Sequence, residues 1–167
     1  MERKLEVLMS CMFLNDVEDF LSSKNLESDI LIINQCNEVG SQEFYFFNNQ
    51  GEKYLARIIS TKDRGLSKSR NLAIANAKGE ILLISDQDVI FQKNYSRNIV
   101  KTYEKNPEAD IILFSVSSNN KHDSQNSLKK IGFVGAMRAK SIETTLKSEK
   151  IRNSGLRFDE AMGAGTG

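Results

Sequence analysis

Two aspartates, Asp86 and Asp88, follow a run of four aliphatic residues and a serine, so they stand where the chain leaves a predicted strand. Hard carboxylate oxygens suit Mg²⁺ or Mn²⁺, which proteins usually hold with one or two carboxylates plus the phosphates of a substrate. Because they are spaced by one residue, one carboxylate can reach a metal while the other reaches a hydroxyl. Taken alone, Asp-Gln-Asp is equally a solvated turn, and its interest comes from its position.

The segment before this strand combines a glycine, the start of a predicted helix and an arginine. Gly65 permits close backbone approach, and the free amides at the start of a helix over residues 66–77 make a seat for a pyrophosphate. On a helical wheel Arg70 falls on the apolar face, where a guanidinium needs a partner because an unpaired buried charge is costly. Asp63, Asp86 or a ligand phosphate are the available anions. The alternatives are a simple loop-to-helix turn and a structural ion pair.

The elements that must position these groups alternate between strand-like and helix-like segments. All-apolar runs of strand length indicate a sheet covered on both faces, and the helices between them indicate parallel crossovers. We therefore expect an α/β, Rossmann-like fold with a mostly parallel central sheet flanked by helices and with ligands at the carboxyl ends of its strands. The predicted strands are 5–13, 30–33, a run closed by Ile58 and Ile59, 81–84 and 111–116, and the predicted helices are 16–24, 66–77 and 94–105.

Two local features of this layout lead to further expectations. Asn15 is predicted to cap the first helix while Glu18 reaches back to it. The segment 42–50 contains four consecutive aromatic residues, 44–47, and is expected to be an extra strand or a packed loop. Clustered phenylalanines usually bury, so these aromatics are predicted to belong to the core rather than to a sugar-stacking platform.

Length and composition limit the class of protein. The chain has 167 residues, of which 40% are hydrophobic and 27% charged, and it carries a net charge of +1. These values fit a single globular domain over residues 1–167 and give no support to nucleic-acid binding. Cys11 and Cys36 make no disulfide framework, which favours a cytoplasmic location. The sequence contains no run of about 18 apolar residues, so no membrane-spanning segment is predicted. Membrane association is expected only through regions or partners outside this chain.

Two further chemistries find no support in the sequence. His122 is the single histidine and lies in a polar stretch, 118–127, so neither a structural zinc site nor a Ser-His-Asp triad is expected. The glycine-rich residues 163–167 have no predicted strand before them and no helix after them. The dinucleotide-binding fingerprint therefore fails there.

Four segments in order along the chain resemble a known family. Residues 63–74 and 77–88 read D-R-G-L-S-K-S-R-N-L-A-I and A-K-G-E-I-L-L-I-S-D-Q-D. They resemble the N-G-G-L-S-x-A-R-N and A-x-G-E-[YI]-[IL]-x-F-L-D-x-D signature of family 2 glycosyltransferases with the GT-A fold. Residues 135–138, Gly-Ala-Met-Arg, look like the family's strand facing the donor sugar, and 158–165 look like its F-D-E-x-[FM]-G-x-G segment. The collinear matches cover nearly the whole chain and are more specific together than any one of them.

The resemblance implies transfer of a sugar from a nucleotide-sugar donor to a hydroxyl of a glycan or lipid-linked acceptor, usually with inversion and with Mn²⁺ or Mg²⁺ as cofactor. It implies that Asp86 lies near the donor and that Asp88 contacts the metal that neutralises the diphosphate, while a carboxylate base takes the acceptor proton. Bacterial surface polysaccharide synthesis is the commonest role of the family. The donor-binding residues so implied are Met12, Asn34, Asp63, Gly65, Arg70, Asp86, Gln87 and Arg138.

The sequence departs from the family pattern at two places. Residues 10–12 stand where the family has a Pro-x-Tyr-like element, and Asn34 and Gln35 stand where it has paired aspartates, so the identity of the nucleotide stays open. The chain also ends before the carboxylate pair that supplies the family's base. We therefore expect a C-terminally truncated, donor-binding portion whose base lies beyond Gly167, with Asp159 and Glu160 as fallback candidates.

Two alternatives remain beside the glycosyltransferase. A non-catalytic nucleotide-sugar or partner-binding domain is favoured by the missing base and by the amides at 34–35. A sugar-phosphate nucleotidylyltransferase would show a glycine-rich loop with arginine and lysine after the first strand. Residues 14–16, Leu-Asn-Asp, do not resemble such a loop.

Overall fold

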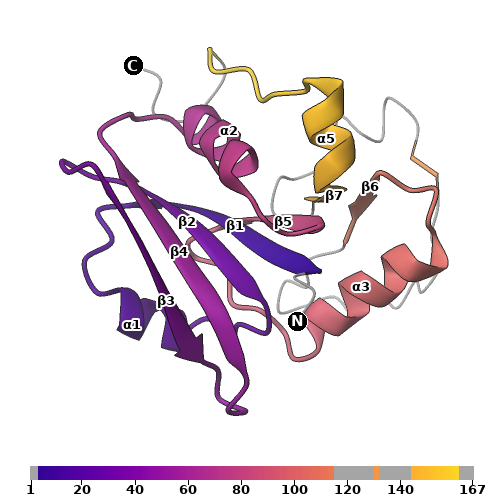
Figure 1. Ribbon diagram of the computed structural model, residues 1–167, viewed down its shortest axis with the longest axis horizontal. Coiled ribbons are helices and arrows are strands. Elements are labelled where there is room, and N and C mark those ends of the chain that lie inside the picture. The colour runs from indigo at the N-terminus through magenta and orange to yellow at the C-terminus, as the bar shows by residue number, and fades with distance from the viewer. Residues whose placement is uncertain (1–3, 115–129, 132–143, 162–167) are drawn as a thin grey trace.

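A seven-stranded sheet runs through the described part of the chain in the order β3-β4-β2-β1-β5-β7-β6 (Figure 1). The structure is a computed structural model and describes residues 4–114, 130–131 and 144–161. The strands are β1 (Leu5–Met12), β2 (Asp29–Gln35), β3 (Gly40–Phe47), β4 (Lys53–Thr61), β5 (Ile81–Asp86), β6 (Ile111–Leu113) and β7 (Thr144–Lys147). The helices are α1 (Val17–Ser22), α2 (Leu66–Asn76), α3 (Tyr95–Lys105) and α5 (Ser148–Ser154).

The centre of the sheet is parallel and its flanks are antiparallel. Strands β4, β2, β1 and β5 run in the same direction, whereas β3 pairs antiparallel with β4, and β7 pairs antiparallel with both β5 and β6. The expectation of a mostly parallel sheet therefore holds for the strands that carry the predicted site. The all-apolar run at residues 30–33 of β2 is explained by burial on both faces of the sheet, since all four residues are fully buried.

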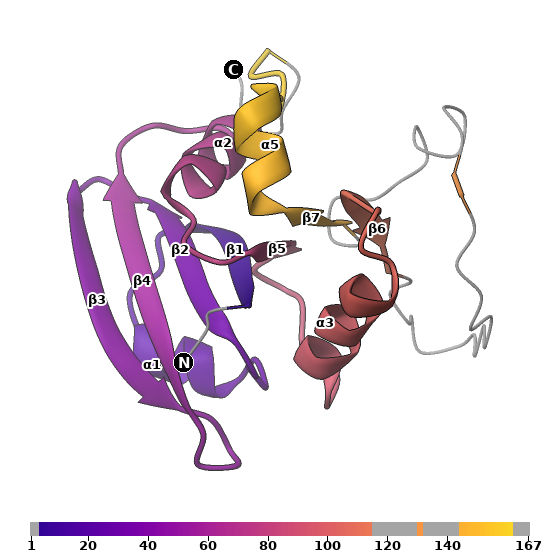
Figure 2. The ribbon, with the colours of Figure 1, turned by 45° about the vertical axis from the view of Figure 1, so that its right-hand side comes forward.

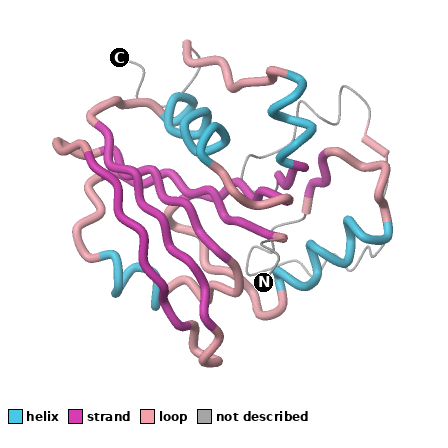
Figure 3. Tube along the Cα trace, viewed as in Figure 1, coloured by secondary structure: helices cyan, strands magenta, loops and turns pink. Residues whose placement is uncertain are grey.

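Helices cover both faces of this sheet, as Figures 2 and 3 show. One core joins α2 and α5 to the face that carries Leu8, Leu31 and Leu82. The other joins α1 and α3 to the opposite face. The chain thus forms three layers, helix on sheet on helix, and the carboxyl ends of the parallel strands emerge between them.

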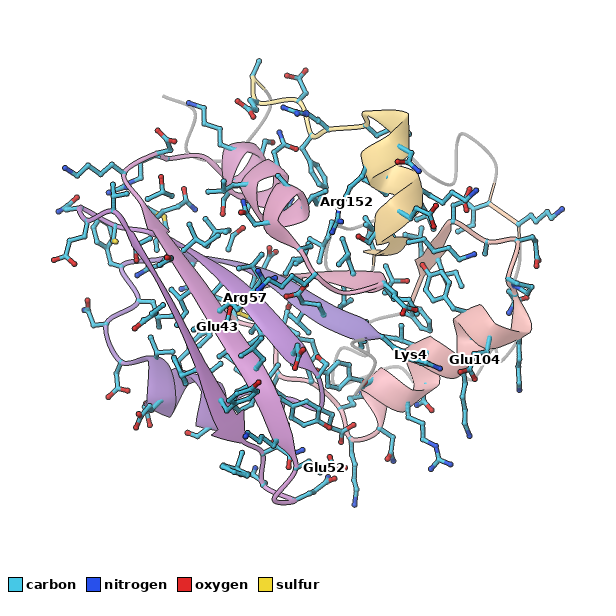
Figure 4. The ribbon with its side chains drawn as sticks, viewed as in Figure 1. Lys4, Glu43, Glu52, Arg57, Glu104 and Arg152 are labelled. Carbon is cyan, nitrogen blue, oxygen red and sulfur yellow. The ribbon has the colours of Figure 1, made fainter. Side chains whose placement is uncertain are left out.

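A buried ion pair connects strands that are distant in sequence. Glu6 on β1 and Arg57 on β4 are 2% and 8% exposed, and the Arg57 Nη2 atom donates to Glu6 Oε1 at 2.5 Å (Figure 4 labels Arg57). The other Glu6 oxygen accepts the amides of Lys78 and Gly79 at 2.6 and 2.8 Å. Gly79 is required here, because a Cβ atom at this position would lie 2.6 Å from that of Glu6. The α2–β5 turn is thereby fixed against the first strand.

Some local predictions need correction. The first helix is capped by Asp16, whose Oδ1 accepts the Asp19 amide at 2.9 Å, and not by Asn15, because the helix begins one residue later than predicted. The aromatic segment is a strand, β3, but only Phe44 and Phe46 pack on the core, while Tyr45 and Phe47 are 58% and 68% exposed.

The other differences lie near the C-terminal part of the chain. Strand β7 and helix α5 were not predicted, because the sequence T-T-L-K has no extended apolar run and the seven-residue helix carries only two buried residues. The strand predicted over 111–116 is described as β6 only to Leu113. His122 and the glycine-rich residues 163–167 lie outside the described residues.

Candidate functional site

The polar residues predicted to form a site meet at one edge of the sheet. The strand register places Ser10 opposite Asp86, Met12 opposite Gln35, and Gln35 opposite Thr61. Because β1, β2, β4 and β5 are parallel, all four carboxyl ends open at this edge. This is where ligands collect in open α/β sheets.

The first contact at this edge is an ion pair between Asp86 and Arg70. The Arg70 Nη2 atom on α2 lies 2.9 Å from Asp86 Oδ1, and the two side chains are 11% and 37% exposed. The prediction that Arg70 meets an anion is confirmed, and one of its partners is Asp86. The buried guanidinium holds the carboxylate in place while part of that carboxylate stays open to solvent.

A buried lysine anchors the turn after β5. Lys24 is 7% exposed, and its Nζ atom donates to the backbone oxygen of Gln87 at 2.5 Å while lying 4.8 Å from the centre of the Phe20 ring. The Gln87 side chain accepts the amide of Met12 at 3.2 Å. Both contacts fix the backbone between Asp86 and Asp88, so they set the direction in which the second aspartate leaves the turn.

Lys24 also acts on a neighbouring thiol. Burial raises the pKa of Cys11 to about 12, and the positive charge of Lys24 opposes that rise. Among the described residues Lys24 forms no ion pair with a carboxylate, so its charge is met by the Gln87 carbonyl and the Phe20 ring.

Asn34 supports the loop after β1. Its Oδ1 accepts the amide of Leu14 at 2.9 Å, and its Nδ2 donates to the Leu14 carbonyl at 3.0 Å. This pairing supports a turn in which Phe13 has a φ of 50°, a conformation that non-glycine residues rarely adopt. Both ends of the amide are therefore occupied by the backbone in this structure.

The turn before α2 is held in a similar way. Gly65 has a φ of 121°, which an L side chain adopts only with strain, and its amide donates to the buried Gln35 Oε1 at 2.8 Å. The amide of Gly65, the residue predicted to permit close approach of a pyrophosphate, is thus engaged inside the protein. Asp63 is exposed beside it, with its own amide on the Thr61 hydroxyl at 3.1 Å.

Asn71 joins α2 to the F-D-E segment. Its Oδ1 accepts the Phe158 amide at 2.8 Å, and its Nδ2 donates to the Phe158 carbonyl at 3.0 Å and to Glu160 at 2.9 Å. The neighbouring Arg70 lies 5.6 Å from the centre of the Phe158 ring. Two consecutive residues of α2 thus connect the aspartate turn to the segment that carries Asp159 and Glu160.

Beside this connection lies a cavity of about 530 Å³. It runs along α2 and is lined among others by Asp63, Lys68, Asn71, Arg157 and Glu160. Asp86 and Asp88 are not among the residues that line it. The cavity borders the F-D-E segment, where Glu160 lines it and Asp159 does not.

The described residues contain no cluster of three or more histidine, cysteine or acidic side chains that could enclose a metal. Asp88 is exposed in the turn, and no hydrogen bond or ion pair to its side chain is formed within the described ranges. A single free carboxylate next to a second one fits Mg²⁺ or Mn²⁺, which keep waters and take further ligands from substrate phosphates. The residues present therefore fit such an ion only together with a phosphate ligand.

A family model described as glycosyl transferase family 2 matches residues 15–161 of the sequence. The chain belongs to this family. No curated protein matches the sequence of this family 2 member. None of its described helices has the length and apolar character needed to cross a bilayer.

Solved structures share the fold of this chain. The chain is similar to S. aureus TarS 1–349, with a TM-score of 0.63 and 13% identity over 94% of this chain and 50% of that one. The TarS complex with UDP-GlcNAc gives a TM-score of 0.61 over 95% and 49%, and the complex with UDP gives 0.62 over 96% and 52%, both at 13% identity. The family 2 chain thus has the GT-A fold and spans about half the length of these proteins.

Three residues at this candidate site have roles that the sequence did not reveal. Lys24 resembles an ordinary lysine near a helix end, and only the tertiary contact with Gln87 reveals it. Asn71 was visible inside the S-R-N motif, but nothing in the motif says that it holds Phe158. Gln35 stands at the position of one of the family's paired aspartates, and its side chain accepts the amide of Gly65 and so orders the turn there. Of the predicted donor-binding residues, Arg138 lies outside the described residues.

Proposed function

We propose that the chain is the donor-binding part of a glycosyltransferase that moves a sugar from a uridine diphosphate sugar to an acceptor hydroxyl, with inversion and with Mn²⁺ or Mg²⁺. The observation that carries the proposal is the geometry around Asp86 and Asp88, placed by Arg70 and Lys24 at the open edge of the parallel strands. Family membership supports the reaction class. Similarity to a protein solved with UDP and UDP-GlcNAc supports the nucleotide.

In this proposal each aspartate has a separate task. Asp86 is fixed by Arg70, so it can accept hydrogen bonds from the hydroxyls of the nucleotide sugar without moving. Asp88 is exposed and free to take the metal, which when bound stabilises the departing diphosphate as a Lewis acid. Met12 and Gln87 form one wall of the donor site, and Asp63 and Gly65 form the turn on the opposite side. Arg138 completes the donor set.

The acceptor side is proposed to lie at the F-D-E segment. Glu160 is held by Asn71 at 2.9 Å and Asp159 accepts the Ala161 amide at 2.9 Å, so both carboxylates have fixed positions. They are the base candidates within this chain, and the family's usual base follows the glycine-containing segment. The acceptor is a glycan or a lipid-linked hydroxyl, and the enzyme works on the cytoplasmic side in surface polysaccharide synthesis.

Calorimetry of UDP binding with and without Mn²⁺ tests the donor site. We expect Asp88→Asn to abolish the Mn²⁺-dependent part of the affinity, because an amide is a much weaker ligand for a hard cation. The matched control is Asp19→Asn, at an exposed position on α1. Unchanged Mn²⁺-dependent affinity in Asp88→Asn would refute the metal assignment.

A transfer assay separates the enzyme from a binding domain. The protein is incubated with a UDP-sugar and Mn²⁺, and release of UDP is followed with and without acceptor oligosaccharides. Turnover that is lost in Asp86→Asn supports the proposal. Tight binding of UDP-sugars without turnover, in a chain extended past residue 167 as well, identifies a non-catalytic binding domain instead.

A further inference from the structure

Among the described residues, strand β3 leaves a long edge of the sheet without a neighbouring strand. It is eight residues long, contains no proline or lysine, and keeps an unbroken register with β4 from Gly40 to Phe47. Figure 2 shows it at the outer side of the sheet, with no described element beyond it. Natural monomers usually protect such edges with bulges, prolines or lysines, because unpaired strand edges recruit other strands.

The outward-facing backbone groups of β3 can be assigned from the hairpin. The Asn48 amide donates to the Glu52 carbonyl at 3.0 Å, so residues 48 and 52 form a hydrogen-bonded pair. Because such pairs alternate along an antiparallel ladder, even-numbered residues of β3 bond to β4 and odd-numbered residues point their amides and carbonyls outward. The odd-numbered residues are Ser41, Glu43, Tyr45 and Phe47, whose side chains share one exposed face.

We propose that two copies of this chain pair through β3, antiparallel about a two-fold axis at Phe44. The outward amides and carbonyls of the two copies bond to each other only if odd-numbered residues face odd-numbered residues. The numbers of facing residues then add up to an even number, so the two-fold axis must pass through a residue of β3 and not between two residues. An axis at Glu43 would place two glutamates directly opposite each other, which is destabilising. An axis at Tyr45 would leave Ser41 beyond the end of the partner strand. The axis at Phe44 pairs Ser41 with Phe47 and Glu43 with Tyr45 across the interface.

Charge complementarity supports this register. The Nζ atom of Lys53 lies 4.0 Å from the centre of the Tyr45 ring in the same chain. When Glu43 of one copy faces Tyr45 of the other, its carboxylate comes next to that copy's Lys53, and symmetry makes this contact twice. Glu43 is half exposed and its present partner is Lys78 at 3.3 Å, on a side chain that is also half exposed (Figure 4 labels Glu43). The same pairing buries Phe47 and sets the two Phe44 rings opposite each other.

Sedimentation velocity over a concentration series tests the dimer. We expect the wild-type chain to dimerise, and Glu43→Lys or Lys53→Glu to raise the dissociation constant by about tenfold, because each change turns two attractions into repulsions. The double variant, with both charges exchanged, should recover the wild-type constant. Lys78→Met is the control, since it removes only the intrachain partner of Glu43 and should leave the constant unchanged.

Tyr45→Pro provides a second test that does not depend on charge. The Tyr45 amide points outward, so proline removes a donor of the proposed interface and none of the β3–β4 bonds. A monomer that keeps the wild-type far-ultraviolet circular dichroism supports the proposal. A wild-type chain that stays monomeric up to about 0.1 mM overturns it, since a complex with a dissociation constant of about 1 μM would be formed there. Failure of the exchanged double variant to recover dimerisation also overturns it.

Discussion

Replacing Lys24 with methionine removes a buried ammonium group while keeping a side chain of similar length. The hydrogen bond from Nζ to the Gln87 carbonyl, at 2.5 Å, is lost, and so is the contact with the Phe20 ring. The variant therefore separates two roles of this lysine. It can stabilise the fold, or it can hold the turn between Asp86 and Asp88 in a binding-competent conformation.

The two effects differ in size. A hydrogen bond to a charged group contributes about 1.5–3 kcal/mol and a cation–aromatic contact about 0.5–2 kcal/mol. Burying an ammonium group costs several kcal/mol, which the methionine avoids. These contributions nearly cancel, so we expect the free energy of unfolding to change by less than about 1 kcal/mol. The turn, however, loses its anchor, and re-ordering the backbone of Asp88 on binding costs about 1–2 kcal/mol, or about 5- to 30-fold in affinity.

Three measurements on Lys24→Met check this reasoning. Urea denaturation gives the free energy of unfolding, calorimetry gives the affinity for UDP with Mn²⁺, and amide hydrogen exchange reports the order of the turn through Val89, whose amide donates to the Asp86 carbonyl at 3.2 Å. We expect faster exchange and weaker binding at nearly unchanged stability. Unchanged exchange at Val89 together with unchanged affinity would refute the anchoring role.

Three further predictions concern residues that support the site. Gly79→Ala forces a Cβ atom to 2.6 Å from that of Glu6, and we expect thermal denaturation to show a loss of about 1–3 kcal/mol; a loss near zero would mean that β1 shifts freely. Asn34→Asp removes the donor to the Leu14 carbonyl and sets a carboxylate against it, so urea denaturation should show a loss of about 1–3 kcal/mol, and no loss would contradict the structural role of this amide. The pKa of Cys11 is raised to about 12, so its stabilising contribution is present below a pH of about 9 and is lost as the pH rises toward 12; chemical denaturation should show this decline in wild type and less of it in Cys11→Ala.

The central strands could be predicted from the sequence because a strand buried on both faces requires a run of apolar residues. Strands β1, β2 and β5 each contain a run of mostly apolar residues that are buried. The strands at the flanks of the sheet lack such continuous apolar runs. β3 alternates between packed and exposed aromatics, and β7 has only two fully buried residues, so composition there does not distinguish a strand from a loop.

Contacts in the site could be predicted where a charged side chain needed an opposite charge. They could not be predicted where a side chain bonds to a backbone group. Arg70 on an apolar helix face required an anion, and Asp86 provides one. Lys24, Asn34 and Gln35 instead bond to backbone groups of other loops, at Gln87, Leu14 and Gly65. Such contacts depend on where the loops meet in space, and residue type alone does not reveal them.

The buried carboxylate of Glu6 also constrains the order in which the chain can fold during synthesis. Its partners Arg57, Lys78 and Gly79 follow it by 51, 72 and 73 residues. Until the ribosome has released all three, the first strand would carry an unsatisfied charge into the core, which is strongly unfavourable. β1 therefore becomes the stable centre of the sheet only after the α2–β5 turn is made. A nascent chain arrested while residue 79 is still inside the ribosome should remain open and accessible to chaperones, whereas one from which β5 has emerged can close around its own N-terminal strand.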